Sequence, residues 1–356
     1  VNFLGMGGFK LKECSSEEKI KLSNQFEIQI VKHDFYDSSL SIKTPDLNIL
    51  NINDCPINDL KLLKKFKKKY GRFDLLLTQF SYAAWKGGVE NIELRRRAAN
   101  DKLITIENQA KILECKQVIP FASFIYFSNK LNFYMNDSIN TPEKLTKYFN
   151  NNNFELVIMQ PNEEQLAGKL KQNDDSINFW RDKYKDIEKR NCKIDKYDSE
   201  VDDVELIAAY ENYKKKLFTK NSKIFIYLLE KIKFLRIFQK INVFILDKNQ
   251  NYEYSIFSGL KKTNSKNKDV SLHSQSLLFL FKNEFGFDTL TVNGCFESSL
   301  EGFAKISKTF AIGSLNAMGL SLDIKIFTKP KVILLFLSKL RNLLNKMKST
   351  SRNETL

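Results

Sequence analysis

The sequence predicts a layered α/β fold in the N-terminal half of the chain and an α+β region after it. Two observations support this prediction. Up to about residue 142, apolar strand patterns alternate with amphipathic helical patterns, and a sheet covered by helices buries the apolar side of both. Beyond that point the composition changes to an asparagine run at 150–153 and a densely charged stretch at 174–211. We therefore expect a first domain at residues 1–165 and a second at 166–356.

Three strands and a helix open the chain. Residues 26–31 alternate apolar and polar side chains, as a half-buried strand does. Residues 39–43 and 47–52 supply two more strands, separated by a turn at 44–46. A helix is expected at 59–70, because its apolar residues recur on one face while lysines occupy most of the others.

A buried strand at 73–78, a long amphipathic helix at 92–113 and a strand at 117–119 complete this half. The spacing of the long helix predicts a buried face made of Leu94, Ala98, Ile106, Ala110 and Leu113.

The C-terminal half mixes both kinds of element. Residues 241–257 predict a hairpin, and 259–268 a polar loop. A helix at 272–283 and a short strand at 289–292 follow. The stretch 332–348 has the pattern of a basic amphipathic helix, which either docks on its own domain or lies on a membrane surface.

The chain is strongly basic, with 57 Lys and Arg against 42 Asp and Glu in 356 residues and a formal charge of +15. Such a charge favours an anionic substrate, nucleic acid or a membrane surface. Compositional drift is the alternative, since Lys, Asn, Ile and Phe are all abundant and acidic residues are interspersed with the basic ones. We expect an anionic small molecule as the partner and no specific nucleic acid.

Five scattered cysteines without a Cys-x-x-Cys pair argue against a disulfide framework, a zinc ribbon or an iron–sulfur cluster. No signal-peptide pattern opens the chain, and no apolar run reaches the roughly 18 residues that a transmembrane segment needs. These features predict a cytoplasmic protein. The chain begins at Val1 without a polar lead-in, which is typical of a fragment.

The clearest candidate for site chemistry is Asp54. An apolar strand leads directly into Asn53 and Asp54, and a carboxylate at the end of a strand is where layered α/β folds often place a site. A hard oxygen ligand held by a rigid strand suits a metal-dependent hydrolase. The alternative is that Asp54 only starts a turn or caps the following helix.

Two further groups of residues are candidates for ligand binding. Arg95 and Arg96 begin the long helix, where positive charge is unfavourable to the helix dipole, so they are candidates for contacting a phosphate. A solvated surface is the alternative. Ser123, Asn132 and Asn136 follow the strand at 117–119 and are expected at the same sheet edge as Asp54, where they bind a ligand or cap loops.

Three segments, residues 50–55, 77–83 and 119–124 followed by 132–136, together resemble the metallo-β-lactamase-fold part of the CMP-N-acetylneuraminate hydroxylase family and its bacterial relatives, which are themselves similar to ascorbate-6-phosphate lactonases. Residues 270–296 also resemble the C-terminal region of that family. The resemblance implies a partial αββα sandwich that binds divalent zinc or iron between two sheets, with Asp54 in the place of the bridging aspartate.

The same resemblance implies that the loop at 79–88 lines the substrate cleft. In that cleft Ser81 and Tyr82 would donate hydrogen bonds, and Trp85 would stack on a ring of the substrate. Ordinary packing is the alternative for Trp85. The substrate class that the resemblance implies is a sugar nucleotide or a phosphorylated sugar.

The sequence departs from the family in two respects. The superfamily's His-x-His-x-Asp-His motif is absent, and only His33 and His273 occur. His33 is a candidate metal ligand, or else a surface or core histidine; His273 is expected to be structural. The cysteine and histidine pairs of a Rieske domain are also missing, so a separate Rieske protein is a candidate partner.

These observations lead to a metal-dependent hydrolase-like protein, expected to be a fragment with its histidine motif ahead of Val1. The alternative is a non-catalytic protein that binds a sugar nucleotide, or docks a Rieske partner, through a degenerate metal site.

Overall fold

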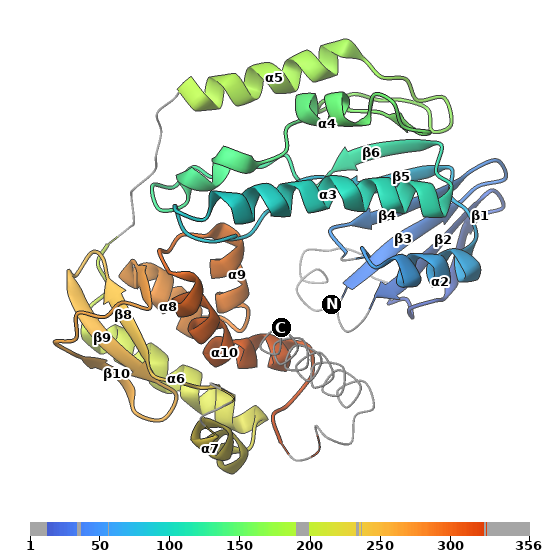
Figure 1. Ribbon diagram of the computed structural model, residues 1–356. Helices are drawn as coiled ribbons and strands as arrows, with labels where there is room; N and C mark the ends of the chain where they lie inside the picture. Colours follow the sequence, from blue (N-terminus) through green and yellow to red (C-terminus); the bar gives the residue numbers. More distant parts are fainter. Residues whose placement is uncertain are drawn as a thin grey trace, which may run out of the picture. The chain divides into compact units, whose positions relative to one another are not determined.

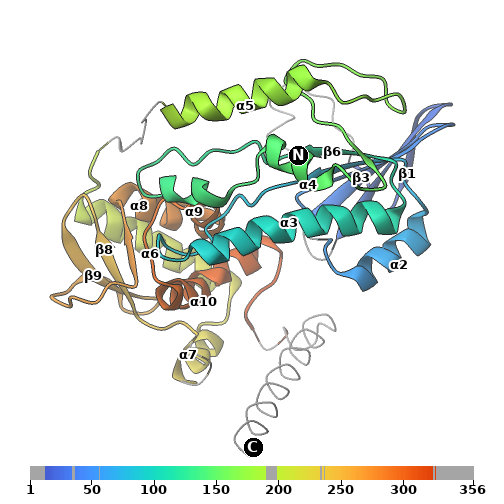
Figure 2. The ribbon, with the colours of Figure 1, turned by 45° about the horizontal axis from the view of Figure 1, so that its top comes forward.

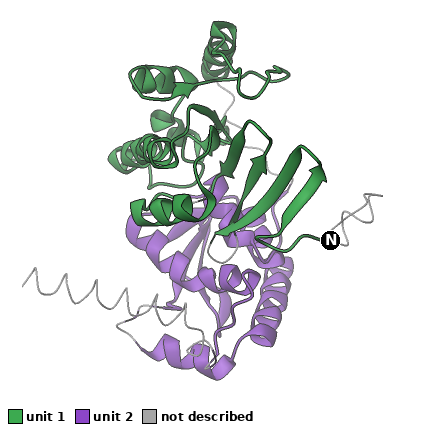
Figure 3. Ribbon diagram, turned by 90° about the vertical axis from the view of Figure 1, so that its right-hand side faces the viewer, with its two compact units in different colours: residues 1–195 green, residues 196–356 purple. Residues whose placement is uncertain are grey.

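The computed structural model describes residues 13–33, 37–55, 57–189, 199–232, 235, 237–323 and 325. The chain divides into two compact units, residues 1–195 and 196–356 (Figure 3). The predicted boundary at 165/166 falls inside the first unit. Helix α5 (Asp174–Lys189) belongs to this unit, where Trp180 stacks on Phe124 with ring centroids 3.9 Å apart.

The described residues of the first unit form a seven-stranded mixed sheet in which the strands follow one another in chain order (Figure 1). The first four strands are antiparallel, whereas the last three run parallel to the fourth. The strands are β1 (Lys19–Ser23), β2 (Phe26–His33), β3 (Asp37–Lys43), β4 (Asn48–Asn53), β5 (Leu75–Gln79), β6 (Gln117–Phe121) and β7 (Glu155–Leu156).

Helix α2 (Leu60–Tyr70) forms where the sequence predicts a helix, for local reasons. The side chain of Asp59 accepts a hydrogen bond of 2.9 Å from the amide of Leu62 and so caps the first turn. Gly71 ends the helix at φ 88°, a value that costs little only for glycine. The two apolar residues of the helix that are buried, Leu63 and Phe66, face the sheet.

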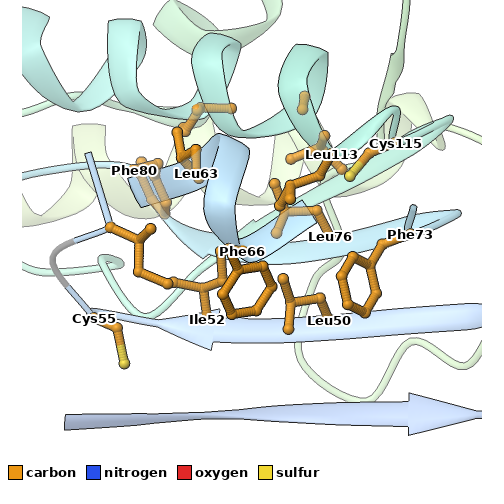
Figure 4. Packing of buried hydrophobic residues seen from close by; sticks show 14 of the residues in the cluster. Leu50, Ile52, Cys55, Leu63, Phe66, Phe73, Leu76, Phe80, Leu113 and Cys115 are labelled. Carbon is orange, nitrogen blue, oxygen red and sulfur yellow. The ribbon is translucent and has the colours of Figure 1, made fainter. Parts of the chain in front are cut away.

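Helix α3 (Ile92–Leu113) lies against the same face of the sheet and contacts α2 (Figure 2). Between the helices and the strands is the core of the unit, where Leu50, Ile52, Phe66 and Leu76 pack together (Figure 4). Burying each such side chain contributes about 1.5–3 kcal/mol to folding.

In the N-terminal half of α3, the buried face differs by about one residue from the predicted face. Leu94, expected in the core, is 36% exposed, and the buried residue of that turn is Arg95. The apolar spacing alone missed this because the guanidinium of Arg95 is buried with a long-range partner, Asp137. Ile106, Ala110 and Leu113 are buried as predicted.

The other face of the sheet is covered in part. Over β5 and β6, Leu75 packs with Val157 and Leu170. The strand registers align Ile28, Ile42 and Ile49 across β2, β3 and β4 on that face, and these three residues are half-buried. The mixed α/β class is therefore confirmed and is compatible with a sandwich. The predicted metallo-β-lactamase-like sandwich stays a prediction.

A loop region and two short helices follow β6 in the first unit. Here η1 (Phe133–Ser138) and α4 (Pro142–Phe149) precede β7. Thr141 caps α4, since its hydroxyl accepts a hydrogen bond of 3.3 Å from the amide of Lys144, and Leu145 and Phe149 are buried in the core of the unit.

The second unit contains a four-stranded sheet in the order β10-β9-β8-β11, with β11 parallel to β8. Its strands are β8 (Ile241–Ile245), β9 (Gln250–Ser255), β10 (Gly259–Lys262) and β11 (Val270–Leu272), and its helices are α6 (Asp203–Lys220), α7 (Lys223–Lys231), α8 (Ser274–Lys282), α9 (Gly286–Asn293) and α10 (Leu300–Ala317). The hairpin of β8 and β9 and helix α8 confirm two predictions.

Two predictions for this unit are wrong. The supposed loop at 259–268 begins with β10, which pairs antiparallel with β9. The supposed strand at 289–292 lies in helix α9, which Gly294 ends at φ 66°. Leu290 is buried, and Phe287 stacks on Phe310 with centroids 5.9 Å apart, so tertiary packing overrides the local β preference of the Thr-Leu-Thr-Val run.

Residues 332–348, the predicted basic amphipathic helix, lie outside the described residues. Within the described part of the chain, no helix combines the length and the apolar character needed to cross a membrane.

Candidate functional site

The candidate site is the sheet edge at which β4, β5 and β6 end. These strands are parallel, and the registers pair Asn53 with Thr78 and Gln79 with Phe121, so their carboxyl ends are aligned. At this edge the backbone adopts the left-handed conformation at two residues, Asn53 (φ 56°) and Ala122 (φ 57°). Non-glycine residues in this region are uncommon and often accompany functional sites.

Asp54 lies at this edge, as predicted, in the turn that follows β4, and it is exposed. It does not cap helix α2, because Asp59 has that role. Its negative charge raises the pKa of Lys102 on α3, although burial has the larger, opposite effect on that pKa. The carboxylate of Asp54 is therefore open to solvent and acts on Lys102 through its charge, without forming an ion pair with it.

His33 ends β2, and the antiparallel pairing of β2, β3 and β4 brings that end to the same edge. Its Nε2 lies 2.8 Å from the hydroxyl of Ser39, and its ring stacks on Phe66 with centroids 5.6 Å apart. The histidine is half-buried and is packed against the core of the unit.

The donor set for a metal is incomplete among the described residues. They contain no group of three or more His, Cys, Asp or Glu side chains placed to hold a metal ion. Cys55, next to Asp54, donates to the carbonyl of Ser38 at 3.0 Å, and burial beside two carboxylates raises its pKa to about 11. It is therefore a protonated thiol near neutral pH, hydrogen-bonded to the backbone. Asp54 and His33 alone do not fit a divalent metal site.

Arg95, on helix α3, forms hydrogen bonds with the backbone of the loop after β5. Its guanidinium forms an ion pair with Asp137, with 2.6 Å between Nη2 and Oδ2. It also donates to the carbonyl of Gly88 at 2.5 Å and to that of Val89 at 3.0 Å, and it lies 4.9 Å from the ring centroid of Tyr134. In the described structure Arg95 thus connects the loop to η1.

The predicted binding residues of this loop are buried. The Ser81 hydroxyl accepts a hydrogen bond of 3.0 Å from the amide of Asn140, and Ser123 donates to the Ser81 carbonyl at 3.1 Å. The hydroxyl of Tyr82 donates to the carbonyl of Met135. Trp85 is 5% exposed. These contacts join the loops that follow β5 and β6.

Asn132 and Asn136 stabilise the loop before α4. The side-chain oxygen of Asn132 accepts a hydrogen bond of 2.9 Å from the amide of Asn129. The side chain of Asn136 forms hydrogen bonds with both the amide and the carbonyl of Phe127, at 2.8 and 2.7 Å. Of the eight predicted binding residues, all of which the structure describes, Arg96 alone is exposed, and it pairs with Glu93 at 2.7 Å. Their substrate-binding roles stay predictions.

The buried side chain of Gln109 on α3 connects two of the segments that form this sheet edge. Its side-chain oxygen accepts a hydrogen bond of 2.8 Å from Thr78 on β5, and its side-chain nitrogen donates to the carbonyl of Ile57 at 2.9 Å. A buried amide that bonds in two directions resists displacement. Gln109 thereby fixes the position of the end of β5 relative to the segment after Asp54.

The sequence prediction missed Lys102. This half-buried lysine of α3 donates to the side-chain oxygen of Gln79, the last residue of β5. Burial lowers its pKa, and the positive charge of Lys86 lowers it further, against the opposing effect of Asp54. Within the described part of the chain, Lys102 has no carboxylate within ion-pair distance. The sequence did hold an indication of its burial. Lys102 lies three residues after Ala99 and four before Ile106, so helical spacing places it on the same buried face of α3.

Comparison with known proteins gives no family for this chain. No family model matches it, and no curated protein matches it. Solved structures with partial similarity include a mutant of the CmlA β-hydroxylase (TM-score 0.30, 10% identity, covering 44% of this chain and 34% of that chain). They also include CmlA itself, a diiron β-hydroxylase from Streptomyces venezuelae (TM-score 0.27, 12% identity, 44% and 35%).

A protein of unknown function from Enterococcus faecalis is a further partial match (TM-score 0.19, 16% identity, 47% and 40%). The chain spans about a third of the length of the CmlA chains that it matches.

Proposed function

We propose that this chain binds a small phosphorylated ligand, a phosphorylated sugar or a sugar nucleotide, at the edge where β4, β5 and β6 end. The observation that supports the proposal is the half-buried ammonium group of Lys102, whose hydrogen-bond partner is the neutral amide of Gln79. A partly buried charge without a counter-ion is costly. An anion bound there would offset that cost, and Lys86 would add a second positive charge.

The surroundings of Lys102 suit such a ligand. Gln109 and the buried hydrogen bonds of Ser81 hold the edge rigid, and a pre-organised site loses less entropy on binding. The exposed carboxylate of Asp54 is an acceptor for sugar hydroxyl groups. A ligand with phosphate at one end and hydroxyl groups at the other would therefore match both sides of the edge.

The test is calorimetric titration of the full chain with inorganic pyrophosphate, glucose 6-phosphate and CMP. We expect Lys102→Met to weaken binding at least about tenfold, because it removes a charge-assisted hydrogen bond. Lys111→Met is the matched control, since Lys111 is an exposed lysine on the same helix, and it should leave affinity unchanged. Equal affinity of both variants would refute the proposal, provided that both unfold cooperatively.

A metal-dependent hydrolase of the metallo-β-lactamase type is the second candidate. It is favoured by the topology that brings His33, Asp37 and Asp54 to one sheet edge. It requires ligands beyond those that the described residues supply. The test is elemental analysis of the purified protein: stoichiometric zinc or iron that Asp54→Ala removes would support this candidate. Docking of a separate Rieske protein is a proposal that rests on the sequence resemblance alone.

A further inference from the structure

Helix α7 of the second unit presents its apolar residues to solvent. Of the residues of α7, all described in the structure, only Ile226 is buried. Ile224 is 74% exposed, Tyr227 48% and Leu228 53%. The spacing of three and four residues places these side chains on one face of the helix. Here the apolar stripe faces outward, the reverse of the arrangement in α2.

The exposed stripe is held in place by hydrogen bonds at the start of the helix. The Ser222 hydroxyl caps α7 by accepting a hydrogen bond of 3.2 Å from the amide of Phe225. Ser222 in turn donates its amide to the carbonyl of Leu322 at 3.0 Å. The side chain of Asn221 bonds with that of Asn316 at 2.7 Å and with the amide of Leu322 at 2.7 Å. The helix is therefore anchored, and the exposure of its stripe is a property of the folded unit.

Basic residues border this stripe at both ends. Lys223 and Lys231, the first and last residues of α7, are exposed, and the ammonium group of Lys231 lies 4.9 Å from the ring centroid of Tyr227. Lys216, near the end of α6, is exposed as well, whereas its neighbour Lys220 forms an ion pair with Glu284. An apolar stripe bordered by lysines, with a tyrosine between, is the composition of helices that lie in the interface of an anionic membrane.

The sequence after the described residues repeats this chemistry. Residues 332–348 place apolar side chains at 333, 336, 337, 340 and 344, at helical spacing, and contain basic but no acidic residues. Two short basic amphipathic segments joined in one chain bind a surface more tightly than either does alone. Their shared positive charge disfavours pairing with each other and favours a common anionic partner.

We propose that the exposed face of α7, made of Ile224, Tyr227 and Leu228 between Lys223 and Lys231, docks on an anionic lipid surface. The apolar side chains would enter the boundary between headgroups and acyl chains, while the lysines remain among the phosphates. This contact is independent of the ligand site in the first unit.

Co-sedimentation of the full chain with lipid vesicles tests the proposal. We expect binding to vesicles of phosphatidylcholine mixed with phosphatidylglycerol, little binding to phosphatidylcholine alone, and weaker binding at high salt. The double variant Ile224→Ser with Leu228→Ser should weaken binding about tenfold or more, because it removes most of the apolar contact. Val89→Ser with Leu166→Ser is the matched control, since both residues are exposed apolar side chains of the first unit, at 67% and 68%.

Three outcomes would overturn the proposal. The first is the absence of binding to anionic vesicles at low salt. The second is binding that the α7 double variant leaves unchanged but that truncation after Lys325 abolishes, which would assign the contact to the residues after 325 and not to α7. The third is a dimer that the α7 double variant converts to monomer without any vesicle binding, which would make a second copy of the chain the occupant.

Discussion

Arg95 and Asp137, 42 residues apart in the sequence, form a two-pronged ion pair in which Nε lies 2.9 Å from Oδ1 and Nη2 lies 2.6 Å from Oδ2. The side chain of Arg95 is fully buried, whereas that of Asp137 is 28% exposed. The pair joins the start of α3 to η1 and so fixes the loop between β5 and α3. It explains how a cation can occupy the buried face of a helix.

Removing this cation should destabilise the first unit. We expect Arg95→Met to lower the free energy of unfolding by about 3–5 kcal/mol, because Asp137 loses its counter-charge and the carbonyls of Gly88 and Val89 each lose a charged hydrogen-bond donor. Urea denaturation measures the change. Arg96→Met is the control: Arg96 is 60% exposed and pairs with Glu93 one turn earlier, so its loss should cost less than about 1 kcal/mol. Similar effects of the two substitutions would contradict this prediction.

Two buried tyrosines of the second unit should respond in opposite ways to removal of the hydroxyl group. The hydroxyl of Tyr254 has no hydrogen-bond partner among the described residues, whereas that of Tyr210 donates to the carbonyl of Ile256 at 2.9 Å. Tyr254→Phe should therefore be neutral or stabilise by up to about 1 kcal/mol, and Tyr210→Phe should destabilise by about 1 kcal/mol. Thermal unfolding of the two variants makes the comparison, and a larger loss for Tyr254→Phe would refute it.

Stability of the second unit should fall in acid because of Asp203. Hydrogen bonds from Lys262 and Tyr252, with Lys248 nearby, lower the pKa of this carboxyl to about 2. An unfolded aspartate has a pKa near 3.9, so the stabilisation is complete above about pH 5 and is lost as the pH falls through about 2.

The matching experiment compares the wild-type chain with Asp203→Asn across this range. The wild type should be more stable by about 1–2 kcal/mol near neutral pH, and the difference should vanish near pH 2. Asp46→Asn, at an exposed residue of the turn between β3 and β4, serves as the control. A difference that does not change with pH would show that the network does not act through the charge of Asp203.

Ligand affinity should depend on the charge of Lys102. Burial lowers the pKa of this lysine, so its ammonium group is lost at a lower pH than that of an exposed lysine. Pyrophosphate affinity should therefore decline as the pH rises toward the range in which exposed lysines titrate. Lys102→Arg keeps its charge over this range and should flatten the profile. An identical profile for both proteins would exclude Lys102 as the titrating group.

Several elements followed from local sequence alone. The helix at 59–70 was predicted from apolar residues and lysines that lie within a single stretch of chain, and the observed α2 agrees with the prediction to one residue. The hairpin of β8 and β9 was equally local. The place of Asp54 at a sheet edge also followed from sequence, because a strand pattern that ends in a carboxylate defines that edge without knowledge of its neighbours.

Only the tertiary structure determined which charged side chains are buried and which fold residues 289–292 adopt. Leu94 is the more apolar residue, yet Arg95 is the one in the core, because Asp137 supplies its counter-charge from 42 residues away. Residues 289–292 favour a strand locally, but the ring contacts of Phe287 and the burial of Leu290 hold them in a helix. The helical spacing places Lys102 on the buried side of α3, but its contact with Gln79 depends on the folded sheet. A sequence specifies periodicity and caps through neighbouring residues, whereas the burial of a charge depends on partners that only the folded chain brings together.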